Sequence, residues 1–366
     1  PSVHTVDEGG RFLPPVKRWA GRWVKDPQVE KELIEDLKER GLLFKTLKYR
    51  HDYPFCWRCE TPLLYYAKDS WFIRMTALKE QLLANNQKIN WVPAHLKKGR
   101  FGEWLREVKD WAISRERYWG TPLPIWESKE GERICVGSFA ELRKLAKDKR
   151  KVGKNFDPHR PYVDEILLVK DGREYQRVPE VIDVWFDSGA MPFAEWHYPF
   201  ENKAKIDRGE SFPADYISEG IDQTRGWFYT LLAISTLLGK GPAYRNVLSL
   251  GHVLDKQGRK MSKSKGNVIY PREVIDQWGA DALRFYFYSI NQPALPKLFD
   301  SKEVEKVVRN LILKFWNTLV FFTTYANLTG FKPTSLPPRP RAFLDRWILA
   351  VLDETIAVVT SALDSF

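Results

Sequence analysis

Apolar residues are arranged along this chain in two ways, and together they predict a mixed α/β protein. Short apolar runs that stop at polar turns predict buried strands, as at 214–218 and 247–254. Elsewhere apolar residues recur every three or four positions, which predicts amphipathic helices. The first helix begins at Asp26 and Pro27, because Asp caps a helix and Pro suits its first position, and it ends near Gly41.

The same spacing predicts a largely helical second half. The expected helices are 227–238, 271–278, 280–289, 301–330 (capped by Ser301) and 341–366, with a proline-rich linker at 333–340. The long helix has an apolar stripe that we expect to be buried. Its members are Val304, Val307, Val308, Leu311, Ile312, Phe315, Trp316 and Leu319.

Composition and charge narrow the choice of partner and compartment. The 366 residues are 43% hydrophobic, and a net charge of +11 favours a polyanionic partner, nucleic acid before an anionic membrane. The most apolar runs are shorter than the ~20 residues of a membrane span, and the polar start does not resemble a secretory signal. Three cysteines are too few for a disulfide framework. We therefore expect a cytoplasmic protein that does not enter a membrane.

A cationic loop follows the strand expected at 247–254 and the turn signal at 255–258. It consists of Arg259, Lys260, Met261, Ser262, Lys263, Ser264 and Lys265. Ammonium groups stabilise negative charge that develops on phosphate during a reaction, so such a loop suits a polyphosphate. On charge alone, a solvated basic loop is an equally good interpretation.

Polar side chains gather where the strand at 214–218 gives way to a helix. They are Glu219, Asp222 and Gln223, with Gly220 among them. Carboxylates at such a junction can hold an α-ammonium group or ribose hydroxyls, and the glycine permits close approach of the backbone. The alternative is that Asp222 simply caps the helix.

Aromatic residues beside polar turns are candidates for a ligand pocket or for the core. The apolar start at Val181 leads to a polar turn that carries Trp185, and strand ends of open α/β sheets bind ligands. Trp185 either walls an apolar pocket or belongs to the core. At 110–124 Arg and Trp are interleaved with Ser and Gly. That mixture suits stacking on bases and contact with phosphates, or else the tryptophans are buried and the arginines pair with nearby glutamates.

Cys56 and Cys59 form a Cys-x2-Cys pair, which presents two thiolates to one tetrahedral zinc ion. Two further ligands are needed. Cys135 is far along the chain, and His51 is the nearest candidate. The alternative is a pair of small buried residues. The pair is therefore a zinc half-site in this sequence.

Five segments occur in the order found in class Ia aminoacyl-tRNA synthetases, and the chain most resembles the isoleucyl-tRNA synthetase family. They are YPFCWRC (53–59), DWAISRERYWG (110–120), DVWFDSG (183–189), EGIDQTRGW (219–227) and KMSKS (260–264). The second segment is shared with valyl and leucyl enzymes, whereas the fourth favours isoleucine. The resemblance extends from about residue 49 to the end of the sequence.

The resemblance implies activation of isoleucine by ATP with Mg²⁺, then transfer to tRNA(Ile). Lys260 and Lys263 would stabilise the pyrophosphate leaving group, and Trp185 and Trp227 would flank the isoleucine side chain. ATP and the adenylate would be held by Glu219, Gly220, Asp222, Gln223, His252, Val253, Leu254, Met261, Ser262 and Ser264. Zinc at the cysteine pair would need a partner pair that the family carries upstream.

The resemblance also implies the second half of a Rossmann-like parallel sheet with inserted connective modules, followed by α-helical regions. The expected segments are an editing-insertion tail (1–48), a Cys-knuckle and connective segment (49–126), a second connective insertion (127–180), the second half of the Rossmann catalytic domain (181–254), the KMSKS loop and stem-contact region (255–300) and the start of a helical anticodon-binding domain (301–366).

Two family features are missing from the sequence. None of its six histidines lies in a His-x-Gly-His element, and the editing insertion is absent apart from its expected tail. We therefore expect a fragment that cannot form adenylate alone, from an enzyme that is monomeric at full length. The alternatives are a valyl- or leucyl-tRNA synthetase fragment and a catalytically inert tRNA-binding module.

Overall fold

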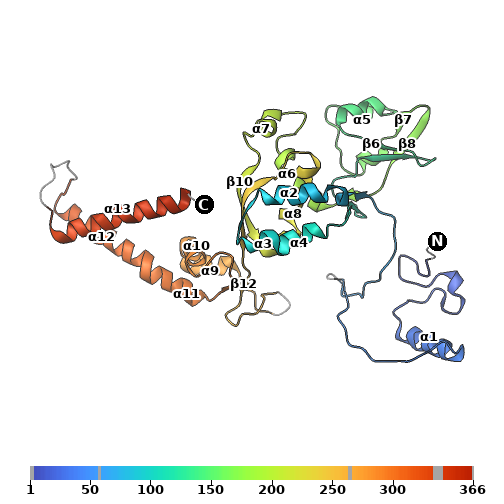
Figure 1. Cartoon of the computed structure of the whole chain (residues 1–366), viewed down its shortest axis with the longest axis horizontal. Helices are drawn as coiled ribbons and strands as arrows, with labels where there is room; N and C mark the ends of the chain where they lie inside the picture. Colours follow the sequence, from blue (N-terminus) through green and yellow to red (C-terminus); the bar gives the residue numbers. More distant parts are fainter. Residues whose placement is uncertain (1–3, 57–58, 263–265, 333–340, 365–366) are drawn as a thin grey trace. The chain divides into compact units, whose positions relative to one another are not determined.

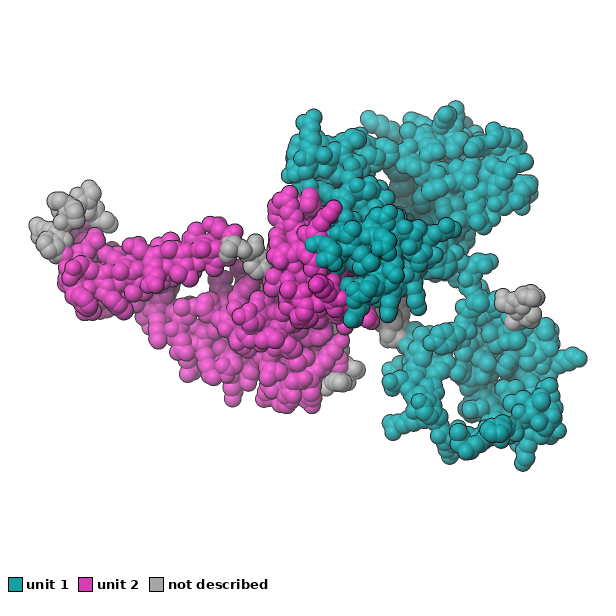
Figure 2. Space-filling model, viewed as in Figure 1, with its two compact units in different colours: residues 1–87, 102–212, 226–243 teal, residues 88–101, 213–225, 244–366 magenta. Residues whose placement is uncertain are grey.

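The computed structural model of the chain describes residues 4–56, 59–262, 266–332 and 341–364 (Figure 1). The chain divides into two compact units, each assembled from separate stretches of sequence (Figure 2). The first unit comprises Pro1–Gln87, Gly102–Phe212 and Gly226–Ala243, and the second comprises Lys88–Phe101, Pro213–Arg225 and Tyr244–Phe366. Each unit has a hydrophobic cluster of its own.

The second unit contains a parallel sheet, as the family resemblance implies, built from strands that the apolar runs predict. Its strands are β2 (Asn90–Val92), β10 (Ala214–Gly220) and β11 (Tyr244–Leu250), in the order β10-β11-β2. Tyr244 and Val247 of the central strand are fully buried, which accounts for the apolar run at this position. The strand predicted at 214–218 is confirmed, and it extends to Gly220.

The apolar run 247–254 forms two strands instead of the predicted one. After β11, a separate two-stranded parallel sheet contains β12 (Val253–Leu254) and β13 (Lys297–Leu298). The break lies at Gly251, whose N–H donates to Pro293 O at 3.0 Å. A Cβ on Gly251 would lie 2.2 Å from Leu295 O, so only glycine lets the chain pass this backbone.

Helices make up most of the rest of the second unit. They are α3 (His95–Lys98), a 3-10 turn (Ile221–Arg225), α9 (Pro271–Trp278), α10 (Ala280–Ser289), α11 (Ser301–Val307), a π turn (Val308–Ile312), α12 (Leu313–Leu328) and α13 (Phe343–Asp364). A buried cluster near α9, α10 and α11 consists of Val274, Ala282, Leu283, Tyr286, Phe299 and Val304. The helices predicted at 271–278, 280–289 and after 341 are confirmed, whereas the predicted linker at 333–340 lies outside the described residues.

The long helix predicted at 301–330 has a different cap and an interruption. Asp300, rather than Ser301, caps it, because the Asp300 carboxylate accepts from Lys302 N at 3.0 Å. The π turn at Val308–Ile312 then separates α11 from α12. Helical periodicity predicts the extent of such a segment but not a local change in its hydrogen bonding.

The prediction that the apolar stripe of this helix is buried is wrong from Leu311 onward. Val304 is fully buried, but Phe315 is 74% exposed and Trp316 is 59% exposed. Leu311 and Leu319 are exposed as well. Periodicity identifies the apolar face of a helix, but it does not say what covers that face. Within the described ranges, no helix is both long and apolar enough to cross a membrane.

The first unit holds the remaining elements. Its helices are α1 (Pro27–Glu39), α2 (Lys79–Gln87), α5 (Phe139–Leu145), α6 (Val184–Ala194), α7 (Lys203–Asp207) and α8 (Trp227–Leu237), with 3-10 turns at Pro14–Trp19, Met75–Leu78, Lys149–Lys151 and Tyr162–Glu165. Its strands are β1 (Phe72–Ile73), β3 (Trp111–Ala112), β4 (Ser114–Arg115), β5 (Ile125–Ser128), β6 (Arg133–Cys135), β7 (Leu168–Lys170), β8 (Arg173–Arg177) and β9 (Val181–Ile182). Helix α4 (Arg100–Arg106) runs along the chain from the second unit into the first.

The first predicted helix is confirmed together with its cap. The Asp26 carboxylate accepts from Gln28 N at 2.9 Å, and Pro27 occupies the first helical position. Val29 is fully buried on the apolar face of α1. Further along, β5 to β8 form a four-stranded antiparallel sheet in the order β6-β5-β8-β7. The cluster beneath it includes Trp126 and Leu168.

The polar turn predicted after Val181 is the first turn of helix α6. Asp183 caps this helix by accepting from Trp185 N at 3.2 Å. The preceding strand β9 pairs antiparallel with β4, so the strand-end argument for Trp185 is wrong. Helix α6 packs closely on α8 at Gly189. The approach needs a glycine there, because a Cβ would lie 2.6 Å from Thr230 O.

Candidate active site

The four residues predicted at the junction meet at the carboxyl end of β10. Glu219 and Gly220 end the strand, and Asp222 and Gln223 lie in the 3-10 turn that follows. A Cβ on Gly220 would lie 2.7 Å from Asp222 Oδ1, and the Gln223 amide donates to Asp222 Oδ2 at 3.0 Å. The N-cap of α8 is Gly226, so the interpretation of Asp222 as a helix cap is wrong.

A buried threonine fixes the 3-10 turn. The Thr224 hydroxyl donates to Ile221 O at 2.7 Å and accepts from Arg100 Nε at 2.9 Å. The side chains of Glu219 and Asp222 remain exposed beside this fixed turn. Exposed carboxylates on a rigid backbone can accept hydrogen bonds from the ammonium or hydroxyl groups of a ligand.

Strands β10 and β11 end side by side. Their parallel register pairs Glu219 with Ser249 and Gly220 with Leu250, so His252 leaves the sheet next to the junction. The carboxyl ends of parallel strands are where ligands bind in open α/β sheets. The second unit therefore brings together two groups of predicted nucleotide-binding residues that are about thirty positions apart in sequence.

The segment predicted to border the adenine is held by strand β13. Lys297 N donates to His252 O at 2.8 Å, while His252 and Val253 are exposed and Leu254 is half-buried. Lys297 is buried, and its ammonium group donates to Asn291 Oδ1 at 2.6 Å. Desolvation lowers the pKa of Lys297. The sequence gives no signal for this residue, because a lysine by itself predicts an exposed side chain.

The lysine segment (residues 259–267) begins from a confirmed turn, in which Gly258 N donates to Asp255 O at 2.8 Å. The backbone of Lys260 pairs with that of Leu254 in an isolated antiparallel β-bridge, and the Lys260 side chain is exposed. Met261 and Ser262 are half-buried. Lys263, Ser264 and Lys265 lie outside the described residues. Lys260 is therefore the predicted pyrophosphate ligand whose position the structure gives.

The Asp255 carboxylate is the centre of this turn. Asp255 Oδ1 accepts from the backbone N–H groups of Gln257 at 3.0 Å and Arg259 at 2.8 Å. Its Oδ2 accepts from Arg259 Nε at 2.9 Å and from Asn267 Nδ2 at 2.9 Å. The hydrogen bond from Asn267, with those from Arg259, lowers the pKa of Asp255 to about 2. The Arg259 guanidinium group is thus engaged within the protein.

The two predicted pocket tryptophans are linked within the first unit. Trp227 Nε1 donates to Ser188 O at 3.2 Å, and the Ser188 hydroxyl donates to Trp185 O at 3.1 Å. Trp185 is 41% exposed and Trp227 is half-buried. Since both tryptophans retain accessible surface, they can contact an apolar ligand.

The Arg- and Trp-rich segment at 110–124 has a structural partner that the sequence did not indicate. Asp183, only 4% exposed, accepts from Arg115 Nη2 at 2.6 Å and from Trp111 Nε1 at 3.2 Å. The partner of Arg115 is therefore an aspartate 68 residues along the chain, instead of a nearby glutamate. The predicted pairing with a glutamate is therefore wrong for Arg115, and the predicted burial of the tryptophans is wrong as well, since Trp111 is half-buried and Trp119 is exposed.

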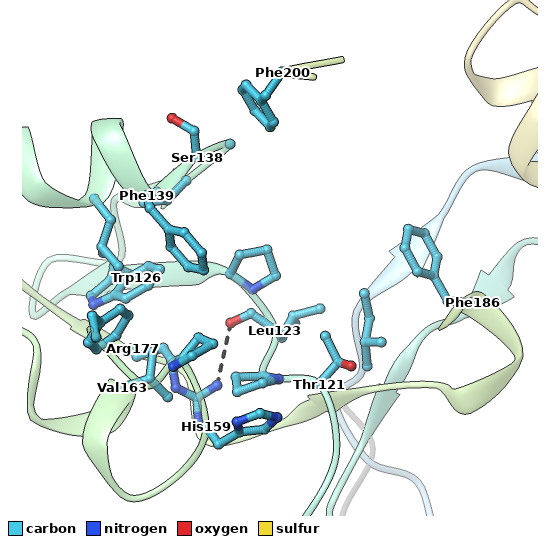
Figure 3. Close-up of a pocket in the computed structure, with 18 of the residues that line it drawn as sticks. Thr121, Leu123, Trp126, Ser138, Phe139, His159, Val163, Arg177, Phe186 and Phe200 are labelled. Carbon is cyan, nitrogen blue, oxygen red and sulfur yellow. Dashed lines mark hydrogen bonds between the residues drawn. The ribbon is translucent and has the colours of Figure 1, made fainter. Parts of the chain in front are cut away.

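The first unit also contains a cavity of about 520 Å³, lined by residues of the four-stranded sheet region and of α6. Trp126 and Phe139 lie on one side and Phe186 on the other, and Arg177 Nη1 donates to Leu123 O at 3.4 Å (Figure 3). Of the predicted site residues that the structure describes, none lines this cavity. Its lining is scattered between residues 121 and 200, so no single motif indicates it.

The predicted zinc half-site does not acquire further ligands. Within the parts of the chain that the structure describes, no group of three or more His, Cys, Asp and Glu side chains is arranged to hold a metal. The Cys59 thiol lies 3.1 Å from the Thr61 hydroxyl, and this hydrogen bond lowers the pKa of Cys59. Two thiols do not complete a tetrahedral zinc site, so the residues present do not fit zinc.

Comparison with known proteins identifies one family. The model of tRNA synthetases class I (I, L, M and V) matches residues 24–295. The isoleucine–tRNA ligase of Thermobifida fusca is 52% identical over 348 residues, covering 91% of this chain and 32% of that protein. Those of Dehalococcoides mccartyi (strain 195) and Clostridium tetani are 49% and 47% identical, cover 100% of this chain, and are themselves covered to 36% and 35%. The chain spans about a third of the length of these relatives.

A solved structure agrees with this family at the level of the fold. A Mycobacterium tuberculosis methionyl-tRNA synthetase in complex with methionyl-adenylate aligns with a TM-score of 0.57 at 17% identity, covering 85% of this chain and 51% of that one. The mixed α/β fold predicted from the apolar pattern is therefore confirmed, together with the parallel sheet that the resemblance implies.

Proposed function

This chain belongs to the class I tRNA synthetases, and from that premise we propose that it carries the ATP- and adenylate-binding residues of an isoleucine–tRNA ligase. A carboxylate oxygen of isoleucine attacks the α-phosphorus of ATP, the bond from that phosphorus to the β-phosphate oxygen breaks, and pyrophosphate leaves. A hydroxyl at the 3′ end of tRNA(Ile) then attacks the acyl carbon and AMP departs. The substrates are isoleucine, tRNA(Ile) and ATP, which binds with Mg²⁺.

One observation carries this proposal. The carboxyl ends of β10 and β11 are paired in register at Gly220 and Leu250, and the chain continues from β11 through His252 to Lys260. Two neighbouring strand ends are thus followed by three kinds of group. The carboxylates of Glu219 and Asp222 suit ribose or an ammonium group, the exposed segment at His252 suits a base, and Lys260 suits a phosphate. This is the sequence of groups that an aminoacyl-adenylate and its pyrophosphate require.

Each residue takes a role that its surroundings permit. The exposed carboxylates of Glu219 and Asp222 accept hydrogen bonds from the α-ammonium group or the ribose hydroxyls. Backbone groups around His252 border the adenine. The Lys260 ammonium neutralises charge that develops on the leaving pyrophosphate, as Lys263 would in the same segment. Neither lysine exchanges a proton or forms a bond, so their effect is electrostatic.

Isoleucine is the amino acid that we infer. The relatives compared above are all isoleucine–tRNA ligases, and the EGIDQTRGW segment favours the same choice. Trp185 and Trp227 would contact the side chain. An apolar pocket separates isoleucine from valine by only ~10–200-fold, because the two differ by one methylene group.

The finer architecture is part of the same proposal. We place the second half of a Rossmann-like sheet at 181–254, the stem-contact region at 255–300 and the start of a helical anticodon-binding domain at 301–366. The parallel pairing of β10, β11 and β2 supports the first assignment. The exposed apolar faces of α12 and α13 support the last, because a helical bundle buries such faces.

Binding to the 366-residue chain tests the proposal. The ligands are ATP and the non-hydrolysable sulfamoyl-adenosine analogues of isoleucyl-, valyl- and leucyl-adenylate, measured by calorimetry. We expect the isoleucyl analogue to bind at least ~10-fold more tightly than the valyl analogue. Lys260→Ala should weaken ATP binding by roughly 10-fold, because a charge-assisted hydrogen bond to phosphate is lost.

Lys302→Ala is the matched control, since Lys302 is an exposed lysine at the start of α11. Its ATP affinity should equal that of the wild type. If the valyl or leucyl analogue binds more tightly than the isoleucyl analogue, the assigned amino-acid substrate is valine or leucine instead of isoleucine. Binding of tRNA without binding of any adenylate analogue would favour the inert tRNA-binding module.

A further inference from the structure

Side-chain hydrogen bonds link Asn267 to Asp255, Lys260 and Ser262, and we call these contacts the neck. Asn267 Oδ1 accepts from Ser262 N at 2.9 Å. Asn267 Nδ2 donates to Asp255 Oδ2 at 2.9 Å and to Lys260 O at 3.3 Å. A side chain needs both a donor and an acceptor to satisfy these three partners, and the carboxamide supplies both.

Asp255 anchors the neck to the rest of the second unit. It is only 5% exposed, and it follows Leu254, whose strand β12 pairs with β13. The same carboxylate holds the backbone and the guanidinium group of Arg259. A buried, fully engaged carboxylate is a rigid point of attachment, because releasing any one donor leaves a charge poorly solvated.

The result of these contacts is that the backbone of Lys260 is fixed on both sides. Arg259 N is bonded to Asp255, and Ser262 N is bonded to Asn267. Between them the Met261 side chain packs against the buried cluster near α9 and α10. The Lys260 side chain is itself exposed. Its ammonium group can therefore reach a ligand from a backbone that is already ordered.

We propose that Asp255 and Asn267 are positioning residues for Lys260, which hold its backbone so that its ammonium group meets a bound polyphosphate from an already ordered backbone. The inference rests on the proposed function, which assigns Lys260 to the pyrophosphate part of ATP. A preordered group binds more tightly than a mobile one, because less conformational freedom is lost on binding.

A double-mutant cycle on the 366-residue chain tests this coupling, with inorganic tripolyphosphate as the probe and calorimetry as the measurement. Asn267→Ala should lower the affinity roughly 2- to 10-fold, the effect of a lost hydrogen bond. In a Lys260→Ala background the same substitution should have almost no further effect, because it acts through the lysine. Equal losses in the two backgrounds would overturn the proposal.

Hydrogen exchange at the Ser262 amide gives a second readout that needs no ligand. This amide should be protected in the wild type and in Lys260→Ala, and should exchange rapidly in Asn267→Ala and Asp255→Asn. Unchanged protection of the β11 amides shows that the variants are folded. A Ser262 amide that exchanges freely in the wild type would contradict the neck.

The two proposals fail in different ways. If the wild-type chain binds no tripolyphosphate, the assignment of Lys260 to the pyrophosphate is wrong. If the Ser262 amide is nevertheless protected in the wild type and loses this protection in Asn267→Ala, the neck is supported as a fixed structure. Asn310→Ala is the matched control, because Asn310 is an exposed asparagine in the π turn. It should change neither the affinity for tripolyphosphate nor the exchange of Ser262.

Discussion

Two buried charged residues of the first unit, Asp183 and Arg177, pair with side chains that are not their neighbours in sequence. Asp183 accepts from Arg115, 68 residues earlier, and the fully buried Arg177 side chain donates from Nε to Asp164 Oδ1 at 2.6 Å, 13 residues away. Burial of these two charges is tolerated because each has an oppositely charged partner. Removing one partner should therefore be more damaging than its exposure to solvent suggests.

Asp183→Ala tests this at the residue scale. The substitution leaves the Trp111 and Arg115 donors without their acceptor and removes the cap of α6. We expect the free energy of unfolding to fall by about 2–4 kcal/mol, measured by urea denaturation.

Asp215→Ala is the control for that substitution, since Asp215 pairs with Arg245 at an exposed position. An exposed pair is worth ~1 kcal/mol or less. Equal losses of stability in the two variants would show that Asp183 is no more important than a surface aspartate.

The neck should respond to acid in a defined range. The pKa of Asp255 is lowered to about 2, below the value near ~4 of an unfolded aspartate, so the unfolded chain takes up this proton more readily. The contribution of Asp255 is then fully present above about pH 4 and is lost as the pH falls through about 2. Exchange at the Ser262 amide, followed from pH 7 to pH 2, measures this loss.

Asp255→Asn should remove that acid-dependent change, because its side chain does not titrate. If the Ser262 amide of Asp255→Asn shows the same pH dependence as that of the wild type, the group that titrates is not Asp255. The comparison therefore isolates one carboxylate among many.

The type of a residue predicts a role, but it does not predict the residue's contacts. Lys260, Glu219 and Asp222 were chosen as candidates because cations and carboxylates in a motif indicate a ligand, and their roles stay predictions. Asn267 and Lys297 were missed, since their roles depend on a hydrogen bond that crosses a loop or on burial beside another strand. Residue type is visible in a sequence, whereas desolvation is a property of the folded chain.

At the scale of elements, hydrophobic periodicity succeeded where a segment has its own start and stop signals. Helix α1 begins at Asp26 and Pro27 as predicted, and α10 has its predicted limits. It failed at 247–254, where the apolar run contains two strands. The pattern contains no sign of this break, because the backbone that crowds Gly251 belongs to residues about forty positions later.

Gly251→Ala tests the reason for that break. The new Cβ would lie 2.2 Å from Leu295 O, so the backbone must move and the β12–β13 pairing must loosen. We expect destabilisation of about 1–3 kcal/mol, measured as the free energy of unfolding, together with faster exchange of the Lys297 amide.

Gly153→Ala is the matched substitution, because a Cβ there meets its nearest atom, Arg150 O, at an ordinary 3.6 Å. It should leave stability within about 0.5 kcal/mol of the wild type. A Gly251→Ala variant that is equally harmless would mean that the Leu295 segment moves aside freely.

At the scale of the whole chain, resemblance to a family predicted what local patterns do not. The order of five motifs indicated the fold class, and the register of β10 and β11 places the strand end that carries the junction beside the end of the strand that leads towards the lysine segment. Local patterns gave the strands but not their order. The pairing of β11 with β2 and β10 joins residues from three distant stretches, and their contacts form only in the folded chain.

The sheet order also has a consequence for biosynthesis. Asn90 of β2 and Asn246 of β11 are hydrogen-bonded across 156 positions of sequence. A ribosome that adds ~5–20 residues per second needs about 8–30 s to make that interval. During this time the nascent β2 strand emerges from the exit tunnel before its partner β11 has been made. The unpaired edge of β2 is then open to chaperones or to other growing chains.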